Sequence, residues 1–353
     1  MSHDGNLSYL QRPSLARRSL ARFQDVLGRF SAGEWYAKQQ SLSGAVILVY
    51  HSVADGASSR WIDPAKRISL SSFKRQMQFL ARHRKVVPLW RVVESLRSGK
   101  PLPAGSVAIT FDDGYRDNLT EAFPVLAALG LPATVFIPSQ HIEDREPPWI
   151  NRLYSAIVHR KAARLKLEHV VSFDGRLETV AQCAAAYVEL SKELFALDYE
   201  PRKTVLAEIA RQLDSDPIPV PIGMNWSDVR EGIARYPGIE FGSHTVTHLD
   251  MSSAMPEVVS SELVRAKDSI ETAIDKQVRY FAYPYSRVGK GDEARVAAAG
   301  YDAGFAGAEK TRVETDCCEY RIPRMDAPHS LGKLALVTSG AFPEISLSLF
   351  GHA

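Results

Sequence analysis

Two adjacent carboxylates, Asp112 and Asp113, lie in residues 110–114 (TFDDG), directly after the apolar run 106–111 (SVAITF). The apolar run predicts a buried strand. Neighbouring carboxylates repel each other unless a cation or a hydrogen-bond donor relieves the charge. One of the pair is therefore suited to bind a metal ion while the other stays free as a base. The alternative interpretation is structural, because Asp-Asp-Gly is also a favourable turn sequence.

A pair of histidines provides the second chemical motif. His244 and His248 lie in residues 242–248 (GSHTVTH), again just after an apolar run. At positions i and i+4 they would share one face of a helical turn, so that both rings reach one ion. Alone, such a pair is often a chance occurrence. Together with Asp113 it forms a ligand set that leaves coordination positions for water and substrate, as a catalytic metal requires.

The third motif is residues 281–286 (FAYPYS), which also end an apolar run. A backbone N–H beside a turn made rigid by proline is suited to face a developing oxyanion. Turns of the aromatic-Pro-aromatic type also occur as ordinary structural features, and the motif alone does not separate the two.

The elements that must position these motifs alternate between short apolar runs and helical segments, which predicts an α/β fold with a mostly parallel sheet. In α/β barrels the loops at the carboxyl ends of the strands build the active site, and all three motifs follow predicted strands. The predicted strands are 45–50, 106–111, 133–137, 238–241, 278–283, 301–305 and 320–322. The predicted helices are 71–80, 118–129, a helix opened by Pro256, and 292–299.

The alternation is interrupted at about 141–224, where helical stretches around 149–160 and 183–213 flank a short segment that is compatible with a hairpin. We interpret this region as a mainly helical insertion or lid. The predicted organisation is a basic helical segment at 1–43, an α/β domain at 44–335 with this insertion, and a C-terminal tail at 336–353.

In that order, TFDDG, HTVTH and FAYPYS resemble the polysaccharide deacetylase family with the NodB-homology fold. Residues 49–53 (VYHSV) resemble a strand-end motif of the branch that includes deacetylases of exopolysaccharides and adhesins. The resemblance covers roughly 44–330, apart from the insertion. It implies a distorted (β/α) barrel and the metal-assisted hydrolysis of an acetyl group, usually on an N-acetylated sugar.

The resemblance also implies a role for each matching residue. Asp112 corresponds to the general base. The metal ligands would be Asp113, His244 and His248. The backbone N–H of Tyr285, next to Pro284, would contact the substrate and stabilise the oxyanion. The implied cofactor is a divalent cation, with zinc suited best to two histidines and an aspartate, and cobalt, nickel or manganese as alternatives.

The sequence departs from the family pattern in two places. The family's arginine two residues before the motif proline is replaced by Ala282, and we expect Arg324 to supply the charge instead, with a surface arginine as the alternative. The family's late Leu-x-His general acid is missing. The remaining candidates are His329 and His352, of which we favour His329, with a solvated loop histidine as the alternative.

Four further residues lie in or beside these motifs or flank the insertion. We expect His51 to lie near the metal and substrate without being a ligand, although a packed histidine is the alternative. Ser286 replaces a common glycine, which matters little if its backbone avoids positive φ. Trp149 and Trp226 flank the insertion and are compatible with either a sugar groove or core packing.

The bulk composition limits the other function classes. The 353 residues are 45% hydrophobic and 24% charged, with a net charge of +2, so nothing points to nucleic acid as a partner. Three cysteines form no disulfide framework. The N-terminus lacks the apolar stretch of a secretory signal, which favours a cytoplasmic location. The basic N-terminal helix is expected to pack on the domain, with peripheral contact to a membrane surface as the alternative.

Three functional hypotheses follow. We favour a metal-dependent N-deacetylase that acts on a polysaccharide or a glycan precursor. The second is an O-deacetylase or a hydrolase of small amides on the same scaffold. The third is an inactive carbohydrate-binding module, which the intact Asp112 disfavours, because binding alone needs no free carboxylate beside a metal ligand.

Overall fold

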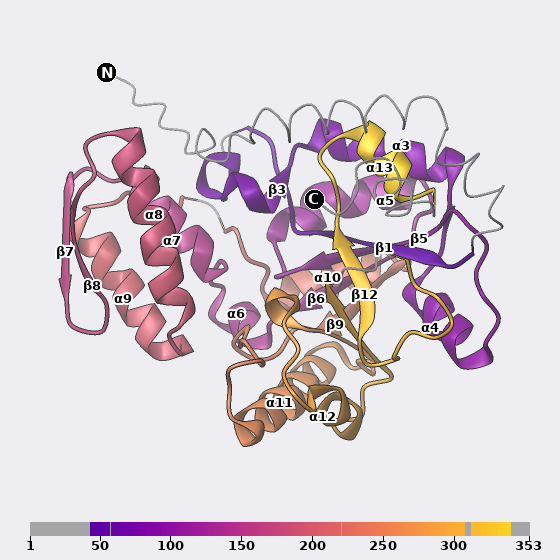
Figure 1. The fold of residues 1–353 in the computed structure, drawn as a ribbon. Coiled ribbons are helices and arrows are strands. Elements are labelled where there is room, and N and C mark those ends of the chain that lie inside the picture. Colours follow the sequence, from indigo (N-terminus) through magenta and orange to yellow (C-terminus); the bar gives the residue numbers. More distant parts are fainter. Residues whose placement is uncertain (1–42, 57, 220, 308–311, 340–353) are drawn as a thin grey trace, which may run out of the picture.

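The computed structural model describes residues 43–56, 58–219, 221–307 and 312–339 (Figure 1). The predicted basic helix at 1–43 and most of the predicted tail at 336–353 thus lie outside the described residues. Among the residues described, no helix is long and apolar enough to cross a membrane.

A closed barrel of parallel strands forms the centre of the molecule. Strand β1 pairs with β12 on one side and with β5 on the other, which closes the ring, and the short strand β4 (Lys85–Val86) extends it beside β5. In order around the barrel, the strands are β1 (Ala45–Tyr50), β12 (Ile322–Asp326), β11 (Ala303–Gly307), β10 (Tyr280–Ala282), β9 (Ile239–Ser243), β6 (Ala133–Ile137) and β5 (Ser106–Asp112). Because every pairing is parallel, the carboxyl ends of all seven strands meet at one rim.

The apolar character of β1 follows from burial on both of its faces, as expected for a parallel strand covered by helices. Val46, Leu48 and Tyr50 pack in the cluster that includes Phe73 of helix α3. The alternate residues Ala45 and Ile47 belong to a second cluster with Phe305 of β11 and Ile322 of the adjacent β12. The period of two along the strand therefore separates the barrel interior from the helix layer.

Helices cover the outside of the barrel (Figure 1). They are α3 (Leu70–His83), α4 (Leu89–Ser98), α5 (Phe123–Ala128), α10 (Trp226–Arg235), α11 (Pro256–Ile274), α12 (Asp292–Ala298) and α13 (Leu331–Val337). The helix predicted over 118–129 begins instead with a wide π-type turn at Asn118–Ala122. Pro124 follows this turn and has no N–H to donate to the preceding turn, which accounts for the irregular start.

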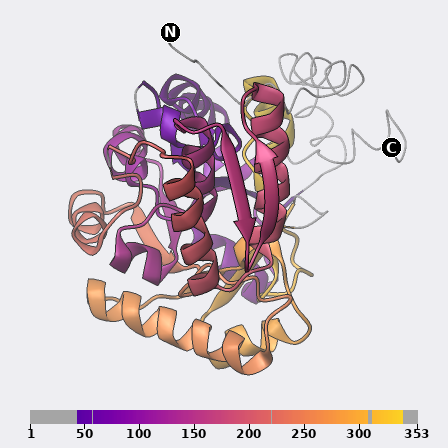
Figure 2. The same cartoon turned by 90° about the vertical axis from the view of Figure 1, so that its left-hand side faces the viewer.

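The insertion forms a separate layer at one side of the barrel and is seen face-on in Figure 2. Its elements are α6 (Ser139–Asp144), α7 (Trp149–Val158), the hairpin of β7 (Arg164–Glu168) and β8 (Ser172–Arg176), α8 (Val180–Phe195) and α9 (Tyr199–Gln212). It has its own hydrophobic cluster, which runs from Leu153 to Leu213 and includes Leu165 and Leu190. This core lets the insertion hold its shape while one edge faces the barrel rim.

Candidate active site

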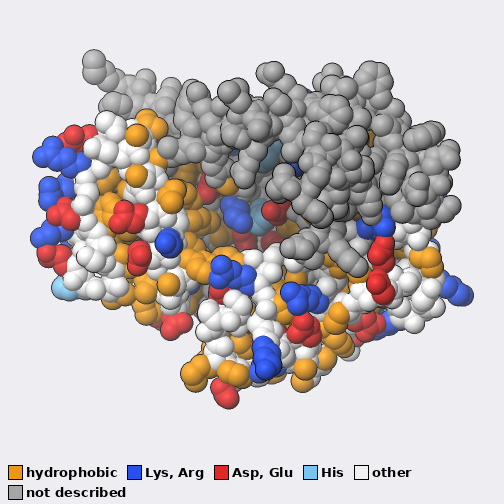
Figure 3. Space-filling view, viewed as in Figure 1, with side chains coloured by type: hydrophobic (Ala, Val, Ile, Leu, Met, Phe, Trp, Pro, Cys, Tyr) orange, Lys and Arg blue, Asp and Glu red, His pale blue; other side chains and the backbone are white. Residues whose placement is uncertain are grey.

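A cavity of about 440 Å³ opens at the carboxyl rim of the barrel. Figure 3 shows charged and histidine side chains gathered in a hollow near the centre of this face. Most lining residues come from the ends of β1, β5, β9, β10, β11 and β12, and one lies just before residue 67. They are Val49, His51, Lys66, Asp112, Asp113, His244, His248, Tyr285, Ser286, Gly307, Arg324, Met325 and Asp326. The three sequence motifs therefore meet around one cavity.

The three predicted metal ligands converge within this cavity. One donor atom each from Asp113, His244 and His248 lies within 4.8 Å of the other two. Asp113 Oδ1 is 3.1 Å from His248 Nε2 and 3.7 Å from His244 Nε2. This oxygen is buried and has no hydrogen bond of acceptable geometry. A buried carboxylate oxygen without a hydrogen-bond donor destabilises the folded protein, because it has lost its hydration. A cation between these three side chains would compensate for that loss.

The tautomer of His244 fits the same interpretation. Its Nδ1 lies 2.7 Å from the carbonyl oxygen of Ala282, which can only accept, so Nδ1 carries the proton. Burial lowers the pKa of His244 to about 4, which leaves the ring neutral. The unprotonated Nε2 then points its lone pair toward Asp113 and lies 3.9 Å from Asp112 Oδ2. A backbone hydrogen bond at one ring nitrogen and a free lone pair at the other are typical of a metal-binding histidine.

The loop that carries the two histidines corrects one prediction. Residues 244–248 do not form a helical turn; they follow β9 as irregular backbone, with Thr245 at φ +65° and His248 at φ +57°. The carboxylate of Glu262 on α11 holds this path. It accepts hydrogen bonds from the N–H groups of residues 246–247 at 2.8 and 2.9 Å. The rings thus approach each other because a buried acid folds the loop, not because of helical spacing.

Asp112 and Arg324 form a buried, two-pronged ion pair. The guanidinium nitrogens lie 2.8 Å from each of the two carboxylate oxygens, and Arg324 is only 2% exposed. Burial alone raises the pKa of Asp112, but the charge and hydrogen bonds of Arg324 lower it below its usual value. Arg324 thus lies beside Asp112, where the sequence analysis expected a substitute for the family arginine that is replaced by Ala282. Its charge keeps Asp112 ionised.

The loop after β10 brings Tyr285 and Ser286 to the cavity, whereas Pro284 is buried and does not line it. Tyr285 has φ +57° and Ser286 has φ +58°. The condition under which Ser286 could replace a glycine without cost is therefore not met, and the left-handed conformation costs roughly 1–2 kcal/mol. The Tyr285 ring packs edge-on against His248 at 4.4 Å between centroids. Burial raises the pKa of the Tyr285 phenol to about 12.

His51 lines the cavity on the side of β1, close to the predicted metal ligand Asp113, as expected from the sequence. Its Nε2 lies 4.0 Å from Asp113 Oδ2 and 3.3 Å from the ammonium of Lys66. The sequence analysis did not identify Lys66, which belongs to no motif. The pairing of β2 (Ser52–Val53) with β3 (Arg67–Ile68) brings it next to His51.

Other residues considered from the sequence lie elsewhere. His329 is exposed in the segment between β12 and α13 and is not among the residues that line the cavity, and His352 lies outside the described residues. Neither Trp149 nor Trp226 lines the cavity. The indole N–H of Trp149 donates to the Tyr285 hydroxyl, and that of Trp226 donates to Glu143.

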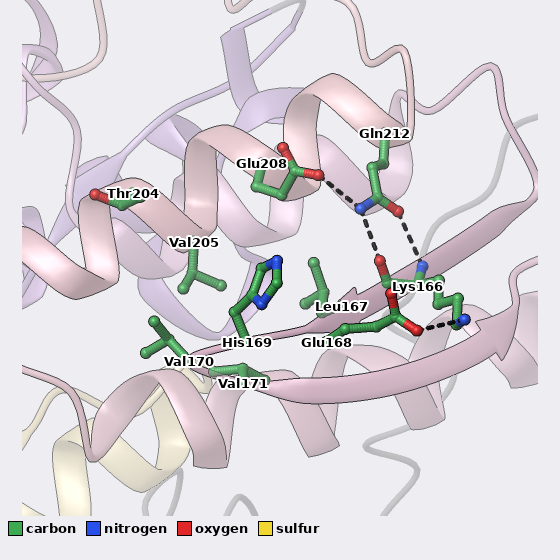
Figure 4. A pocket seen from close by; sticks show the side chains of 10 residues that line it. All are labelled: Lys166, Leu167, Glu168, His169, Val170, Val171, Thr204, Val205, Glu208 and Gln212. Carbon is green, nitrogen blue, oxygen red and sulfur yellow. Dashed lines mark hydrogen bonds and ion pairs between the residues drawn. The ribbon is translucent and has the colours of Figure 1, made fainter.

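A second cavity, of about 250 Å³, lies within the insertion between the β7–β8 hairpin and α9 (Figure 4). Its ionic groups pair locally: Lys166 forms an ion pair with Glu168, and Gln212 donates to Glu208. This cavity contains none of the predicted site residues.

Comparisons with known proteins identify a family for part of the chain. The family model described as polysaccharide deacetylase matches residues 99–164 and 206–304, on either side of most of the insertion. Over 92 residues, or 26% of this chain, the sequence is 34% identical to the poly-β-1,6-N-acetyl-D-glucosamine N-deacetylase of Escherichia coli (strain K12). That match spans 13% of the relative's length.

Solved structures show the same fold. The Streptococcus pyogenes deacetylase PplD in complex with acetate aligns with a TM-score of 0.56 and 16% identity, covering 84% of this chain and 99% of that one. IcaB from Ammonifex degensii aligns with a TM-score of 0.54 and 18% identity, covering 84% and 97%. At these identities the likeness concerns the fold alone.

Proposed function

The barrel of this chain belongs to the polysaccharide deacetylase family, and from that premise we propose that the protein is a metal-dependent hydrolase that removes N-acetyl groups from a carbohydrate. The observation that carries the proposal is the convergence of Asp113, His244 and His248 on one point, beside an Asp112 that Arg324 keeps ionised. Asp112 lies next to the metal ligand set without belonging to it, and Arg324 keeps its carboxylate ionised. Such a carboxylate can accept a proton and so act as a base.

The residues fit a divalent cation held by one carboxylate and two neutral imidazoles, a set that suits zinc best and also accepts cobalt, nickel or manganese. When bound, such an ion would polarise the acetyl carbonyl and lower the pKa of a water molecule. The chain's own residues supply the ligand geometry, because Ala282 orients His244 and Glu262 shapes the loop that carries His248.

We assign the proton transfers to residues that line the cavity. Asp112 takes the proton from the attacking water, and Arg324 fixes the orientation of its carboxylate. As the water oxygen bonds to the acetyl carbon, negative charge develops on the former carbonyl oxygen. The backbone N–H of Tyr285 is assigned to stabilise that charge, which is where such donors contribute most.

We propose that His51, and not His329, gives a proton to the leaving nitrogen as the C–N bond breaks. His51 lines the cavity, whereas His329 does not. Burial, followed by the charge of Lys66, lowers the pKa of His51, so the ring takes up a proton less readily and gives it up more readily once protonated. The products are acetate and a free amine. His51 regains its proton, and Asp112 loses the one it gained, by exchange with solvent.

The test is acetate release from N-acetylglucosamine oligomers by protein that has been stripped with a chelator and then resupplied with zinc. We expect activity to return with zinc and to be absent in Asp112→Asn. Zinc binding without acetate release would contradict the N-deacetylase proposal, and O-acetylated sugars then become the substrates to assay. A failure to bind zinc, cobalt, nickel or manganese would overturn the metal centre itself.

A further inference from the structure

Helix α7 of the insertion contacts two different catalytic loops. The indole N–H of Trp149 donates to the Tyr285 hydroxyl at 2.8 Å. Two residues later in the chain, the amide of Asn151 donates to the hydroxyl of Tyr115, also at 2.8 Å. Tyr115 follows Asp113 by two residues, so α7 connects the loop that holds the metal carboxylate with the loop that holds the oxyanion donor.

The side chain of Trp149 is itself firmly held from within the insertion. The guanidinium of Arg202 lies over the indole at 5.1 Å from the ring centroid. Arg202 is buried and donates to the carbonyl oxygen of Leu194 at 2.8 Å. The neighbouring Phe195 packs edge-on against the Tyr285 ring at 4.7 Å. Helices α7, α8 and α9 thus all contribute contacts that hold the Tyr285 side chain in place.

Asn151 is fixed in the same way. It is fully buried, and its carbonyl oxygen accepts the backbone N–H of Asp63 at 3.0 Å while its amide donates to Tyr115. Buried polar side chains with both ends satisfied are rigid, because any movement leaves a donor or an acceptor without a partner. Asn151 therefore ties the start of α7 to the barrel near Asp113.

Tyr285 needs such support for its backbone. At φ +57° Tyr285 has a left-handed backbone conformation, which is unfavourable for residues other than glycine. Its N–H direction depends on keeping that conformation, and its ring also contacts His248 at 4.4 Å. A bond to the hydroxyl at the far end of the ring fixes the side chain and, through it, the backbone.

We propose that α7 is a positioning element for catalysis, in which Trp149 sets the position of Tyr285 and Asn151 sets that of the Asp113 loop. The inference rests on the proposed function, since it gives the insertion a part in orienting that site. It assigns Trp149 to the support of the oxyanion donor and not to stacking against a sugar ring, because Trp149 does not line the cavity.

The first test is a double-mutant cycle of Trp149→Phe and Tyr285→Phe. Each substitution removes one partner of the hydrogen bond and keeps the backbone N–H: Tyr285→Phe keeps the phenyl ring, and Trp149→Phe replaces the indole with a smaller aromatic ring. Each single variant should lower kcat roughly three- to tenfold, the range expected for one net hydrogen bond, with KM changed less than twofold. The double variant should be no slower than the slower single variant.

Two matched controls remove equivalent bonds elsewhere. Trp226→Phe loses the indole bond to Glu143, and Tyr199→Phe loses the hydroxyl bond to Asp144. Within the described part of the chain, none of these four side chains has a hydrogen bond or ring contact with residues 112–115, 244–248 or 283–287, although Tyr199 stacks on His141. Both variants should therefore keep wild-type kcat. Multiplicative effects of the two test substitutions, or equal losses in the controls, would overturn the positioning role.

A second test does not depend on activity. Hydrogen exchange of the backbone amides at 283–287 should be faster in Trp149→Phe than in the wild type, while exchange at 133–137 in β6 stays unchanged. Unchanged exchange at 283–287 would also refute the inference. If the wild type releases no acetate, the proposed function fails, whereas the exchange experiment still decides whether α7 holds this loop.

Discussion

Arg324 holds both carboxylate oxygens of Asp112 at 2.8 Å, although 212 residues separate the two in the sequence. The strands that carry them, β12 and β5, both pair with β1, which lies between them in the barrel. The parallel order of the strands brings the two side chains to the same rim. The guanidinium satisfies both oxygens, so the Asp112 carboxylate is ionised and fixed in direction before any substrate arrives.

The ion pair predicts a change in pH dependence. Asp112 must be ionised to accept a proton, so activity is lost as pH falls through its pKa. In the wild type Arg324 lowers that pKa below the usual value. In Arg324→Met only the effects of burial and the neighbouring histidines remain, and burial raises the pKa. The acidic limb of kcat/KM against pH should therefore move to higher pH, and Arg324→Lys should lie between the two. An unmoved limb would contradict the assignment of Asp112 as base.

Zinc affinity should separate ligands from other cavity residues. His248→Ala removes one of three ligands and should weaken zinc binding by at least a hundredfold, as measured by calorimetric titration of chelator-stripped protein. His51→Gln, which changes a neighbour of Asp113 but no ligand, should bind zinc within threefold of the wild type. Equal losses in both variants would show that His51 belongs to the ligand set.

Proton transfer to the leaving nitrogen should depend on His51 and not on His329. His51→Gln should lower kcat by roughly 10²–10⁴, the usual contribution of general acid–base catalysis. His329→Gln should stay within twofold, because the side chain is exposed and does not line the cavity. The measurement is steady-state acetate release at saturating substrate, and the reverse pattern would restore His329 as the acid.

Glu262 should be needed for the shape of the metal loop. Its carboxylate accepts two backbone N–H groups and the hydroxyl of Thr247. Glu262→Gln should lower the free energy of unfolding by about 1–2 kcal/mol, since the amide oxygen can still accept the two N–H groups but no longer carries the charge that strengthens these bonds. Zinc affinity should fall as well, because His248 lies on that loop.

Glu257→Gln is the matched control for this variant, because Glu257 is exposed at the start of the same helix. Urea unfolding of the metal-free proteins measures the free energy of unfolding, and zinc titration measures the zinc affinity. Loss of stability with unchanged zinc affinity would show that the loop does not depend on Glu262 for its ligand geometry.

Backbone strain is concentrated around the cavity. Positive φ occurs at eight non-glycine residues of the described chain. Arg145, Asp214 and Asp275 lie at or just past the C-terminal ends of helices. The other five lie in the three loops that carry the motifs: Asp113, Thr245, His248, Tyr285 and Ser286. Such conformations persist only where surrounding contacts enforce them, and they are frequent at active sites. Local sequence preferences do not predict them, which explains why the helical turn expected for His244 and His248 was wrong.

The sequence by itself determined the barrel class and the residues that meet at its rim. Buried parallel strands require continuous apolar runs, and side chains just past their carboxyl ends must share one edge. The order and spacing of the motifs were thus enough to group Asp112, Asp113, His244 and His248. The replacement of a family arginine by Ala282 was also enough to single out Arg324 as the substitute charge.

The tertiary structure alone decided which other groups reach that rim. The contacts of Lys66 with His51, of Glu262 with residues 246–247 and of Trp149 with Tyr285 join segments that are separate in the sequence and carry no motif. The exposure of His329 depended equally on the path of the chain after β12. Contacts of this kind arise from the packing of whole layers, the insertion against the barrel above all, and no local period or spacing encodes them.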